Sequence, residues 1–309
     1  MIAFLFPGQG SQVVGMGKAL AEHSAAARRT FEEADEALGC ALSKVCFEGP
    51  EAELKRTETT QPALLATGVA ILAALREARS DLEPSFVAGH SLGEWTALVA
   101  AGAISFADAL RAVRERGRLM QLAVPEGKGA MFAILGGDAE LITEVCREVE
   151  AELGKVVRPA NFNAPEQTVI SGDADATKVA ADRIVGQGAK KAVALAVSAP
   201  FHSPLMRPAA EGLAVFLEKV AVKAPKIPVI TNVEATPNAD PTRVKALLIE
   251  QITAPVRWVE CMGALRAAGV TRAYELGPSK VLAGLQKRID RSLSIAAIED
   301  PQSLAAAIR

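Results

Sequence analysis

Residues 89–93 (GHSLG) follow the G-x-S-x-G pattern and are the strongest local sign of chemistry in the sequence. Residues 85–88 before them are typical of a short buried strand, and residues 94–101 after them have the pattern of a helix. A serine between a strand and a helix occupies a strained elbow that exposes its hydroxyl, and the next backbone N–H, that of Leu92, points at the same spot. The alternative is a glycine-rich turn that contains a serine by chance, but the flanking elements favour Ser91 as a nucleophile.

A serine nucleophile needs a base, usually histidine, and the sequence has three histidines. His23 lies in a polar helical stretch and is expected at the surface. His90 is the direct neighbour of Ser91, so its side chain should diverge from the serine and serve packing or hydrogen bonding. By elimination His202 is the best candidate, because it lies in residues 198–204 (SAPFHSP), a loop bracketed by two prolines. Without Ser91, a structural loop histidine would be the favoured interpretation.

Residues 8–17 (GQGSQVVGMG) resemble two nucleotide-binding loops but match neither. A dinucleotide fingerprint needs glycine or alanine where Val13 stands, and a phosphate-binding loop needs Lys and Ser or Thr where Met16 and Gly17 stand. A flexible turn remains. Such a turn can lend a backbone N–H to an oxyanion, which acyl transfer to serine requires in addition to the N–H of the elbow.

Arg116 lies on a predicted helix over residues 106–122, at the flank of its apolar stripe. Three other arginines of this helix cluster on the opposite, polar side: Arg111, Arg114 and Arg118. An arginine at the border of a buried face is often a residue whose stem packs while its charge reaches water. It is also the right group to hold a substrate carboxylate by two parallel hydrogen bonds.

The elements that position these residues indicate an α/β fold with an insert. Residues 1–6 predict a buried strand that turns sharply, and residues 61–77 predict a helix. The middle of the chain predicts, in order, a strand over 130–135, a helix over 138–153, strands over 156–162 and 168–171, a helix over 174–185 and a strand over 190–197. This βαββαβ order is ferredoxin-like. We therefore expect an inserted subdomain at 127–197 within a larger α/β domain formed by 1–126 and 198–309.

Composition excludes several classes of protein. Of the 309 residues half are hydrophobic, and 34 Lys and Arg against 36 Asp and Glu leave no basic surplus for nucleic acid. The four scattered cysteines have neither metal-ligand spacing nor the density of a disulfide scaffold, so we expect free thiols. The apolar residues 2–6 are too few for a signal peptide or a membrane span. We expect a cytoplasmic protein without a membrane or nucleic-acid partner.

The sequence resembles the malonyl-CoA:acyl carrier protein transacylases of fatty acid synthesis, and the related acyltransferase domains of polyketide synthases, over nearly its full length. The resemblance rests on many matches in the same order along the chain. They are 6–12 (FPGQGSQ), 89–94 (GHSLGE), 116–121 (RGRLMQ), 160–165 (ANFNAP), the His202 loop, 231–233 (TNV), Gln251, 255–258 (PVRW) and 275–279 (ELGPS).

This resemblance implies a hydrolase-like α/β domain with a parallel sheet, a ferredoxin-like insert, and a site in the cleft between them. It implies transfer of the malonyl group from malonyl-CoA through an ester on Ser91 to the phosphopantetheine thiol of an acyl carrier protein. No metal or bound cofactor is implied, since coenzyme A is part of a substrate, and we expect a monomer. The implied roles are Ser91 as nucleophile, His202 as base, the backbone N–H groups of Gln9 and Leu92 as oxyanion hole, the carbonyl of Gln251 orienting His202, Arg116 binding the malonyl carboxylate, and Asn163 lining the cleft.

Three alternatives stay open. The acyltransferase could serve a polyketide synthase, and Phe201 resembles the residue found where malonyl is preferred over bulkier units. A serine esterase or thioesterase would need an acidic third member, for which Asp173 is the candidate in Ser-Asp-His order. A non-catalytic carrier-binding module is disfavoured by the intact Ser91 and His202. One departure from many relatives is Trp95, which follows the elbow and could reshape the pocket wall.

Overall fold

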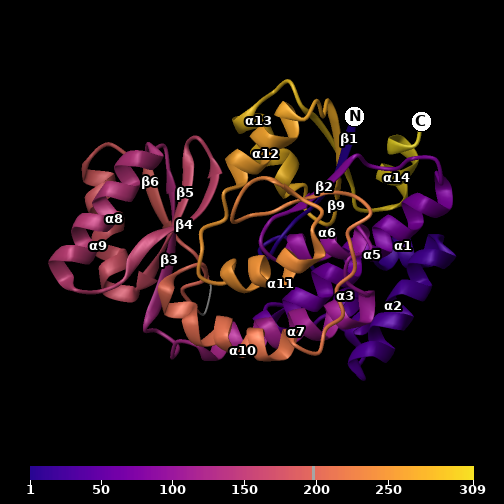
Figure 1. Cartoon of the computed structure of the whole chain (residues 1–309), viewed down its shortest axis with the longest axis horizontal. Helices are drawn as coiled ribbons and strands as arrows, with labels where there is room; N and C mark the ends of the chain where they lie inside the picture. Colours follow the sequence, from indigo (N-terminus) through magenta and orange to yellow (C-terminus); the bar gives the residue numbers. More distant parts are fainter. Residues whose placement is uncertain (197–198) are drawn as a thin grey trace.

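The computed structural model describes residues 1–196 and 199–309, and it is organised around two β-sheets (Figure 1). Neighbouring strands of the larger sheet run parallel, except that β7 and β8 are antiparallel. Its spatial order is β10 (Ser294–Ile298), β9 (Arg272–Leu276), β1 (Ile2–Phe6), β2 (Phe86–Gly89), β7 (Val229–Ile230) and β8 (Pro237–Asn238). The predicted α/β class with a parallel sheet is confirmed.

Helices surround the larger sheet and also connect its strands. They are α1 (Lys18–His23), α2 (Ala25–Leu38), α3 (Leu42–Glu48), α4 (Glu51–Leu54), α5 (Thr57–Ala78), α6 (Leu92–Ala100), α7 (Phe106–Leu122), α10 (Arg207–Leu217), α11 (Pro241–Glu250), α12 (Trp258–Ala267), α13 (Val281–Ile289) and α14 (Pro301–Ala307), with a 3-10 turn η1 (Pro204–Met206). Helix α5 is long and apolar enough to cross a membrane by composition, but the window that qualifies is 78% buried inside the protein.

Both faces of the larger sheet are covered, because successive side chains of a strand point to opposite faces. On β1, Phe4 and Phe6 pack into the core that contains α5, whereas Ala3 and Leu5 pack into a second core against α12 and α13. A parallel strand that is buried on both faces has apolar residues at successive positions, which explains the continuous apolar sequence of β1. Each fully buried Leu or Phe contributes about 1.5–3 kcal/mol.

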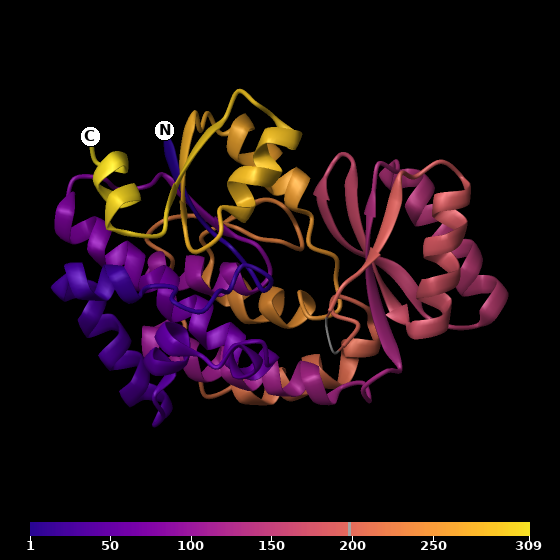
Figure 2. The same ribbon diagram turned by 180° about the vertical axis from the view of Figure 1, so that it is seen from behind.

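The smaller sheet is antiparallel and carries helices α8 (Ala139–Leu153) and α9 (Ala174–Gly186) on its outer face (Figures 1 and 2). Its spatial order is β4 (Val157–Ala164), β5 (Gln167–Asp173), β3 (Gly129–Leu135) and β6 (Lys191–Ala194). Along the chain this gives the predicted βαββαβ order. Strand β6 is shorter than expected, since it ends at Ala194, and the predicted boundary at residues 197 and 198 lies outside the described residues.

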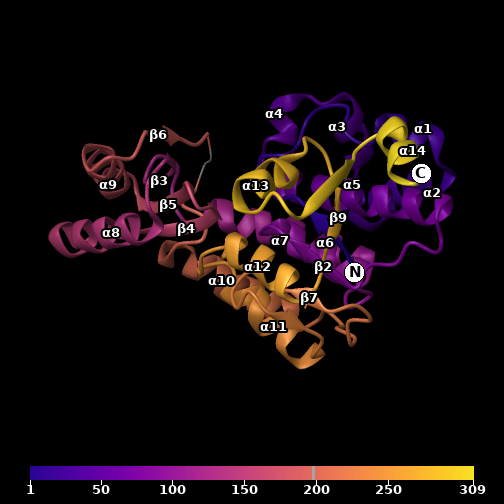
Figure 3. The ribbon, with the colours of Figure 1, turned by 90° about the horizontal axis from the view of Figure 1, so that it is seen from above.

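The alternation of side chains on β3 explains how the small sheet is attached. We call each sheet with its helices a lobe. Phe132 and Ile134 pack with α8 and α9 of the small lobe, whereas Met131 and Ala133 join the core of the larger lobe. Helix α7 points from the larger lobe towards the small sheet, and both termini lie away from that sheet (Figure 3). Residues at the end of α7 therefore lie close to the junction of the two lobes.

Candidate active site

The predicted elbow is present at the end of β2. Ser91 follows that strand with φ 50° and ψ −106° and directly precedes α6. This backbone conformation is rare for a residue with a side chain and is typical of functional sites. The glycines on either side are required by close packing, because a Cβ on Gly89 would lie 1.9 Å from the carbonyl carbon of Gly93, and a Cβ on Gly93 would lie 2.0 Å from the carbonyl oxygen of Phe6.

Gly93→Ala is therefore expected to destabilise the protein strongly, by about 3 kcal/mol, since backbone atoms cannot yield to the added methyl group. Gly263 is the matched control, because it also lies in a helix but a Cβ there meets nothing within 4 Å. Gly263→Ala should stabilise slightly, by about 0.5–1 kcal/mol. Thermal unfolding of both variants measures the difference, and equal melting temperatures would contradict the packing argument.

Ser91 and His202 are in hydrogen-bond contact, with 2.8 Å between Ser91 Oγ and His202 Nε2. The other ring nitrogen, Nδ1, lies 2.9 Å from the carbonyl oxygen of Gln251 and 3.2 Å from that of Ala254. Because carbonyl oxygens only accept, Nδ1 carries the proton and Nε2 presents its lone pair to the serine hydroxyl. Burial, and secondly the positive Arg116, lower the pKa of His202 to about 3, so the ring is neutral at pH 7.

The loop that holds His202 is itself fixed by local contacts. Ser203 is fully buried and its hydroxyl donates to the carbonyl of Pro200 at 2.7 Å. His202 has φ 58°, a second strained non-glycine residue at the site, and it is only 4% exposed. The loop follows the small subdomain in the sequence, and it holds the imidazole in contact with Ser91.

Arg116 is buried, with 2% exposure, and its guanidinium reaches the serine. Nη2 donates to Ser91 Oγ at 3.1 Å and to Gln251 Oε1 at 3.0 Å, and Nη1 donates to Gln61 Oε1 at 2.8 Å. Burial lowers the pKa of Arg116 to about 10, opposed by the nearby Glu94, so the charge is retained at neutral pH. The other arginines of α7 differ: Arg111 and Arg114 donate to carbonyls at the end of α2, and Arg118 pairs with Glu115.

Two side chains that the sequence left without a role complete this arrangement. Asn232 Oδ1 accepts the backbone N–H of Ser91 at 2.7 Å, and its Nδ2 donates to the carbonyl of Gly89 at 2.7 Å, so it holds both sides of the elbow. Gln61 holds the guanidinium of Arg116 from α5. Asn232 belongs to a motif used for the resemblance, but no local pattern indicates a partner 141 residues away.

A cavity opens above Ser91 at the junction of the two lobes. Gln9 and Leu92, the predicted oxyanion donors, both line it, and so does Phe201. Its remaining lining residues are Gln61, His90, Ser91, Arg116, Met120, Met131, Asn161, Leu195 and His202. The wall thus combines apolar side chains of both lobes with a few convergent polar groups, which is typical of a small-molecule site.

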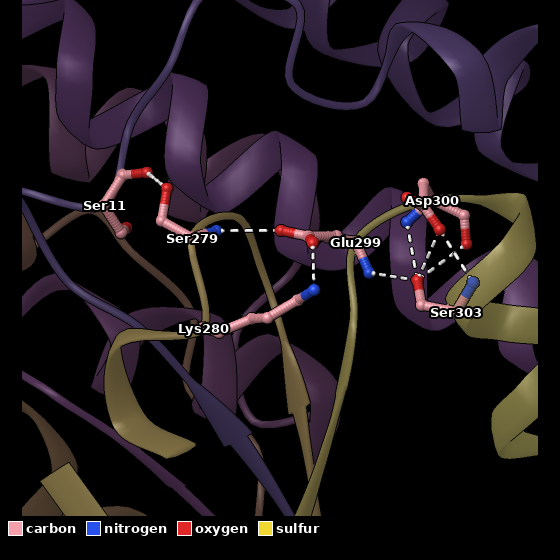
Figure 4. Close-up of polar contacts among 6 residues, drawn as sticks. All are labelled: Ser11, Ser279, Lys280, Glu299, Asp300 and Ser303. Carbon is pink, nitrogen blue, oxygen red and sulfur yellow. Dashed lines mark hydrogen bonds and ion pairs between the residues drawn. The ribbon is translucent and has the colours of Figure 1, made fainter. Parts of the chain in front are cut away.

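The loop that carries Gln9 is braced from the C-terminal part of the chain (Figure 4). Ser279 Oγ donates to the carbonyl of Ser11 at 2.8 Å. Ser279 and Lys280 both have positive φ, 74° and 52°, and Glu299 holds them, accepting from Ser279 N at 3.1 Å and pairing with Lys280 Nζ at 2.9 Å. These contacts fix the position of the loop without contacting the cavity.

Some predicted residues lie elsewhere. Asn163 Oδ1 is 2.7 Å from His90 Nε2, and it is Asn161 that lines the cavity. His90, within the elbow, is a hydrogen-bonding residue as expected, and it also lines the cavity. His23 is exposed at the end of α1. Trp95 is fully buried in the core beneath the elbow and is not among the residues that line the cavity.

The acidic residue of the esterase alternative does not contact the histidine. Asp173 ends β5, and its carboxylate accepts the backbone N–H of Val156 at 2.8 Å. The groups that face His202 Nδ1 are the two carbonyls described above.

The four cysteines are free thiols, and three of them are buried.

Comparison with known proteins agrees with this geometry. The profile of the family described as "Acyl transferase domain" matches residues 3–298. A malonyl CoA-acyl carrier protein transacylase of Bacillus subtilis is 50% identical over 308 residues, which is 100% of this chain and 96% of the relative. An acyl carrier protein S-malonyltransferase of Vibrio cholerae has a TM-score of 0.96 at 47% identity, covering 99% of each chain.

A further solved structure contains a malonyl-transacylase in complex with a type II polyketide acyl-carrier protein. The matched chain of that structure has a TM-score of 0.96 at 46% identity, and the match covers 99% of this chain and 98% of that chain. The match of the family profile covers almost the whole chain, and the identity to curated relatives extends from end to end. This chain therefore belongs to the malonyl CoA-acyl carrier protein transacylase family of acyltransferases.

Proposed function

We propose that the protein transfers the malonyl group of malonyl-CoA to the phosphopantetheine thiol of an acyl carrier protein for fatty acid synthesis, through an ester on Ser91. The observation that carries this proposal is the double contact of Ser91 Oγ, 2.8 Å from His202 Nε2 and 3.1 Å from Arg116 Nη2. A base and a fixed cation at one hydroxyl match a nucleophile whose substrate carries a carboxylate. The names of the relatives support the same activity.

The first half-reaction begins at the serine hydroxyl. His202 Nε2 takes the proton of Ser91 as Oγ bonds to the thioester carbon, and the backbone N–H groups of Gln9 and Leu92 stabilise the resulting oxyanion. The C–S bond then breaks, and the sulfur of coenzyme A leaves with the proton held by His202. Each of the two oxyanion donors is worth about 3 kcal/mol of barrier by the precedent of serine proteases.

The second half-reaction reverses these steps with the phosphopantetheine thiol as nucleophile. His202 takes the thiol proton, the sulfur attacks the ester carbon, and the proton returns to Ser91 Oγ as the ester bond breaks. The carbonyl of Gln251 keeps Nδ1 protonated throughout, so a Ser-His dyad is sufficient. Every proton and charge is thereby assigned to a group of this chain or of the substrates, without a metal ion or bound cofactor.

Arg116 distinguishes a transferase for dicarboxylic acyl groups from a generic one. Arg116→Ala should lower kcat/KM for malonyl-CoA by about tenfold to several hundredfold, because a charge-assisted clamp is lost, and should leave acetyl-CoA largely unaffected. Arg116→Lys keeps the charge without the planar fork and should recover only part of the malonyl activity. Arg118→Ala is the control, since Arg118 pairs with Glu115 at the surface. Equal losses for both substrates would refute the carboxylate role.

The low pKa of His202 predicts an unusual pH profile. A neutral base is required, and the ring remains neutral as the pH falls through the ordinary histidine value of about 6.5. We expect kcat/KM for an acetyl thioester of pantetheine, which has no titrating group, to stay nearly constant between about pH 5 and 7. The buried Glu94, whose pKa burial raises to about 7, keeps an oxygen that accepts hydrogen bonds when it is protonated. A tenfold decline per pH unit below about 6.5 would contradict this environment for His202.

We further propose a cytoplasmic monomer whose macromolecular partner is an acyl carrier protein. The acyl carrier protein in the complex of the polyketide relative supports this partner, and it also raises a second candidate role in polyketide synthesis. Comparing kcat/KM of malonyl transfer to a fatty acid carrier protein and to a type II polyketide carrier protein separates the two. A preference of about tenfold or more for the polyketide protein would overturn the assignment to fatty acid synthesis.

A further inference from the structure

A buried carboxylate lies beneath the elbow and has no part in the reaction as proposed above. Glu94 is the third residue of α6 and is 2% exposed. Its Oε2 accepts the backbone N–H of Asn232 at 2.9 Å and the side-chain Nε2 of Gln251 at 2.7 Å. A carboxylate is costly to bury unless it is hydrogen-bonded, so its presence here calls for a specific function.

The first consequence concerns the Gln251 amide, which can present either its oxygen or its nitrogen to a neighbour. An ionised carboxylate only accepts hydrogen bonds, so the contact with Glu94 at 2.7 Å, the shortest that Gln251 Nε2 makes, requires the nitrogen on that side. The same Nε2 also donates to the carbonyl oxygen of Ser91 at 3.2 Å and to Asn232 Oδ1 at 3.4 Å. Gln251 Oε1 then faces Arg116 and accepts from Nη2 at 3.0 Å. The opposite orientation would place oxygen against oxygen on one side and N–H against N–H on the other.

The second consequence concerns Arg116 and the serine. The same Nη2 that donates to Gln251 Oε1 also donates to Ser91 Oγ, so the position of the amide oxygen fixes where the guanidinium points. Asn232, the other partner of Glu94, accepts the N–H of Ser91. Two short paths thus lead from one carboxylate, one to the cation beside the acyl group and one to the backbone of the nucleophile.

We infer that Glu94 is a positioning residue that orients the Gln251 amide, and through it Arg116, towards the carboxylate of the acyl group. Glu94 therefore contributes to the preference for malonyl over uncharged acyl groups. This inference rests on the proposed malonyl transfer. Burial raises the pKa of Glu94 to about 7, and its hydrogen bonds and Arg116 oppose that rise, so the test is performed at about pH 8 with Glu94 ionised.

The test compares kcat/KM for malonyl-CoA and acetyl-CoA in Glu94→Ala and Glu94→Gln. Glu94→Ala should lower malonyl transfer about a hundredfold and acetyl transfer about tenfold, because both paths are broken but only malonyl needs Arg116. Glu94→Gln keeps an oxygen that accepts both hydrogen bonds, so it should restore the ratio of the two values to within about threefold of the wild type. If the alanine variant does not fold, Glu94→Asp replaces it. Its shorter side chain withdraws the carboxylate oxygens from Asn232 and Gln251, and the ratio of malonyl to acetyl transfer is compared in the same way.

Glu275 offers a matched control, since it is another buried carboxylate with a pKa raised to about 7 by burial. It accepts from the backbone N–H groups of Leu282 and Ala283 at the start of α13, not from the site. Glu275→Gln should lower the melting temperature without changing the malonyl to acetyl ratio.

The inference is overturned if Glu94→Ala, folded by circular dichroism, loses both substrates in equal proportion, because Glu94 is then only structural. It is also overturned if the ratio of malonyl to acetyl kcat/KM falls as far in Glu94→Gln as in Glu94→Ala, because the hydrogen bonds of Glu94 are then not the cause of the malonyl preference. Failure of the proposed function is distinct, since it would appear as absence of malonyl transfer by the wild type itself.

Discussion

Ser91→Ala is expected to abolish the acyl-enzyme and to lower malonyl transfer to an acyl carrier protein on the order of a millionfold, to background. The variant removes the atom that forms the ester. It should fold normally, because alanine meets the same backbone strain at φ 50° as serine and adds no atoms. Transfer of label from radiolabelled malonyl-CoA to the carrier protein measures the loss, and circular dichroism checks the fold.

Ser80→Ala is the control for this experiment, since Ser80 is an exposed serine and should retain full activity. Residual turnover of Ser91→Ala within about a hundredfold of the wild type would mean that another group carries the acyl chain or that transfer is direct. Either result would remove the basis for the proposed two-step mechanism.

His202→Ala should slow acylation on the order of ten-thousandfold, because the serine proton then has no acceptor in contact with Oγ. The truncated side chain leaves a space of imidazole shape, so added imidazole should restore part of the rate. Single-turnover acylation with malonyl-CoA, followed by rapid quenching, measures both effects.

Asp173→Asn tests the rival triad in the same assay. It should change the rate little, since the Asp173 carboxylate accepts a backbone N–H of Val156 and an amide oxygen can do the same. A loss as deep as that of His202→Ala, in a folded protein, would favour an esterase-like triad over the dyad.

The sequence predicted those parts of the site whose signals are local. The elbow is recognisable from its glycines and flanking elements, and the helix predicted over residues 106–122 has the same bounds in the structure. Helical periodicity also separated Arg116 from the other arginines of α7. It could not show that the amide oxygens of Gln61 and Gln251 would accept hydrogen bonds from the guanidinium of Arg116. Those contacts span 55 and 135 residues and depend on tertiary packing.

The irregular strand β4 carries the two asparagines considered for the cavity wall. Strand β4 pairs with β5 through two shifts of register, between Pro159 and Asn161 and between Phe162 and Ala164. Asn161 lines the cavity, and Asn163, two residues further along, contacts His90, which also lines it, so both asparagines lie at the site although only Asn161 reaches the cavity. Glu94, Asn232 and Gln251 could be recognised only as parts of motifs, because their mutual contacts join residues far apart in the sequence and appear only in the folded chain.

An acyl-enzyme on Ser91 is detectable by mass spectrometry of the intact wild-type protein after mixing with malonyl-CoA in the absence of a carrier protein. We predict that the protein gains the mass of one malonyl group, that peptide fragmentation places it on Ser91, and that adding the carrier protein removes it. An unmodified protein that nevertheless transfers malonyl groups, or an adduct on any other residue, would mean that Ser91 is not the nucleophile.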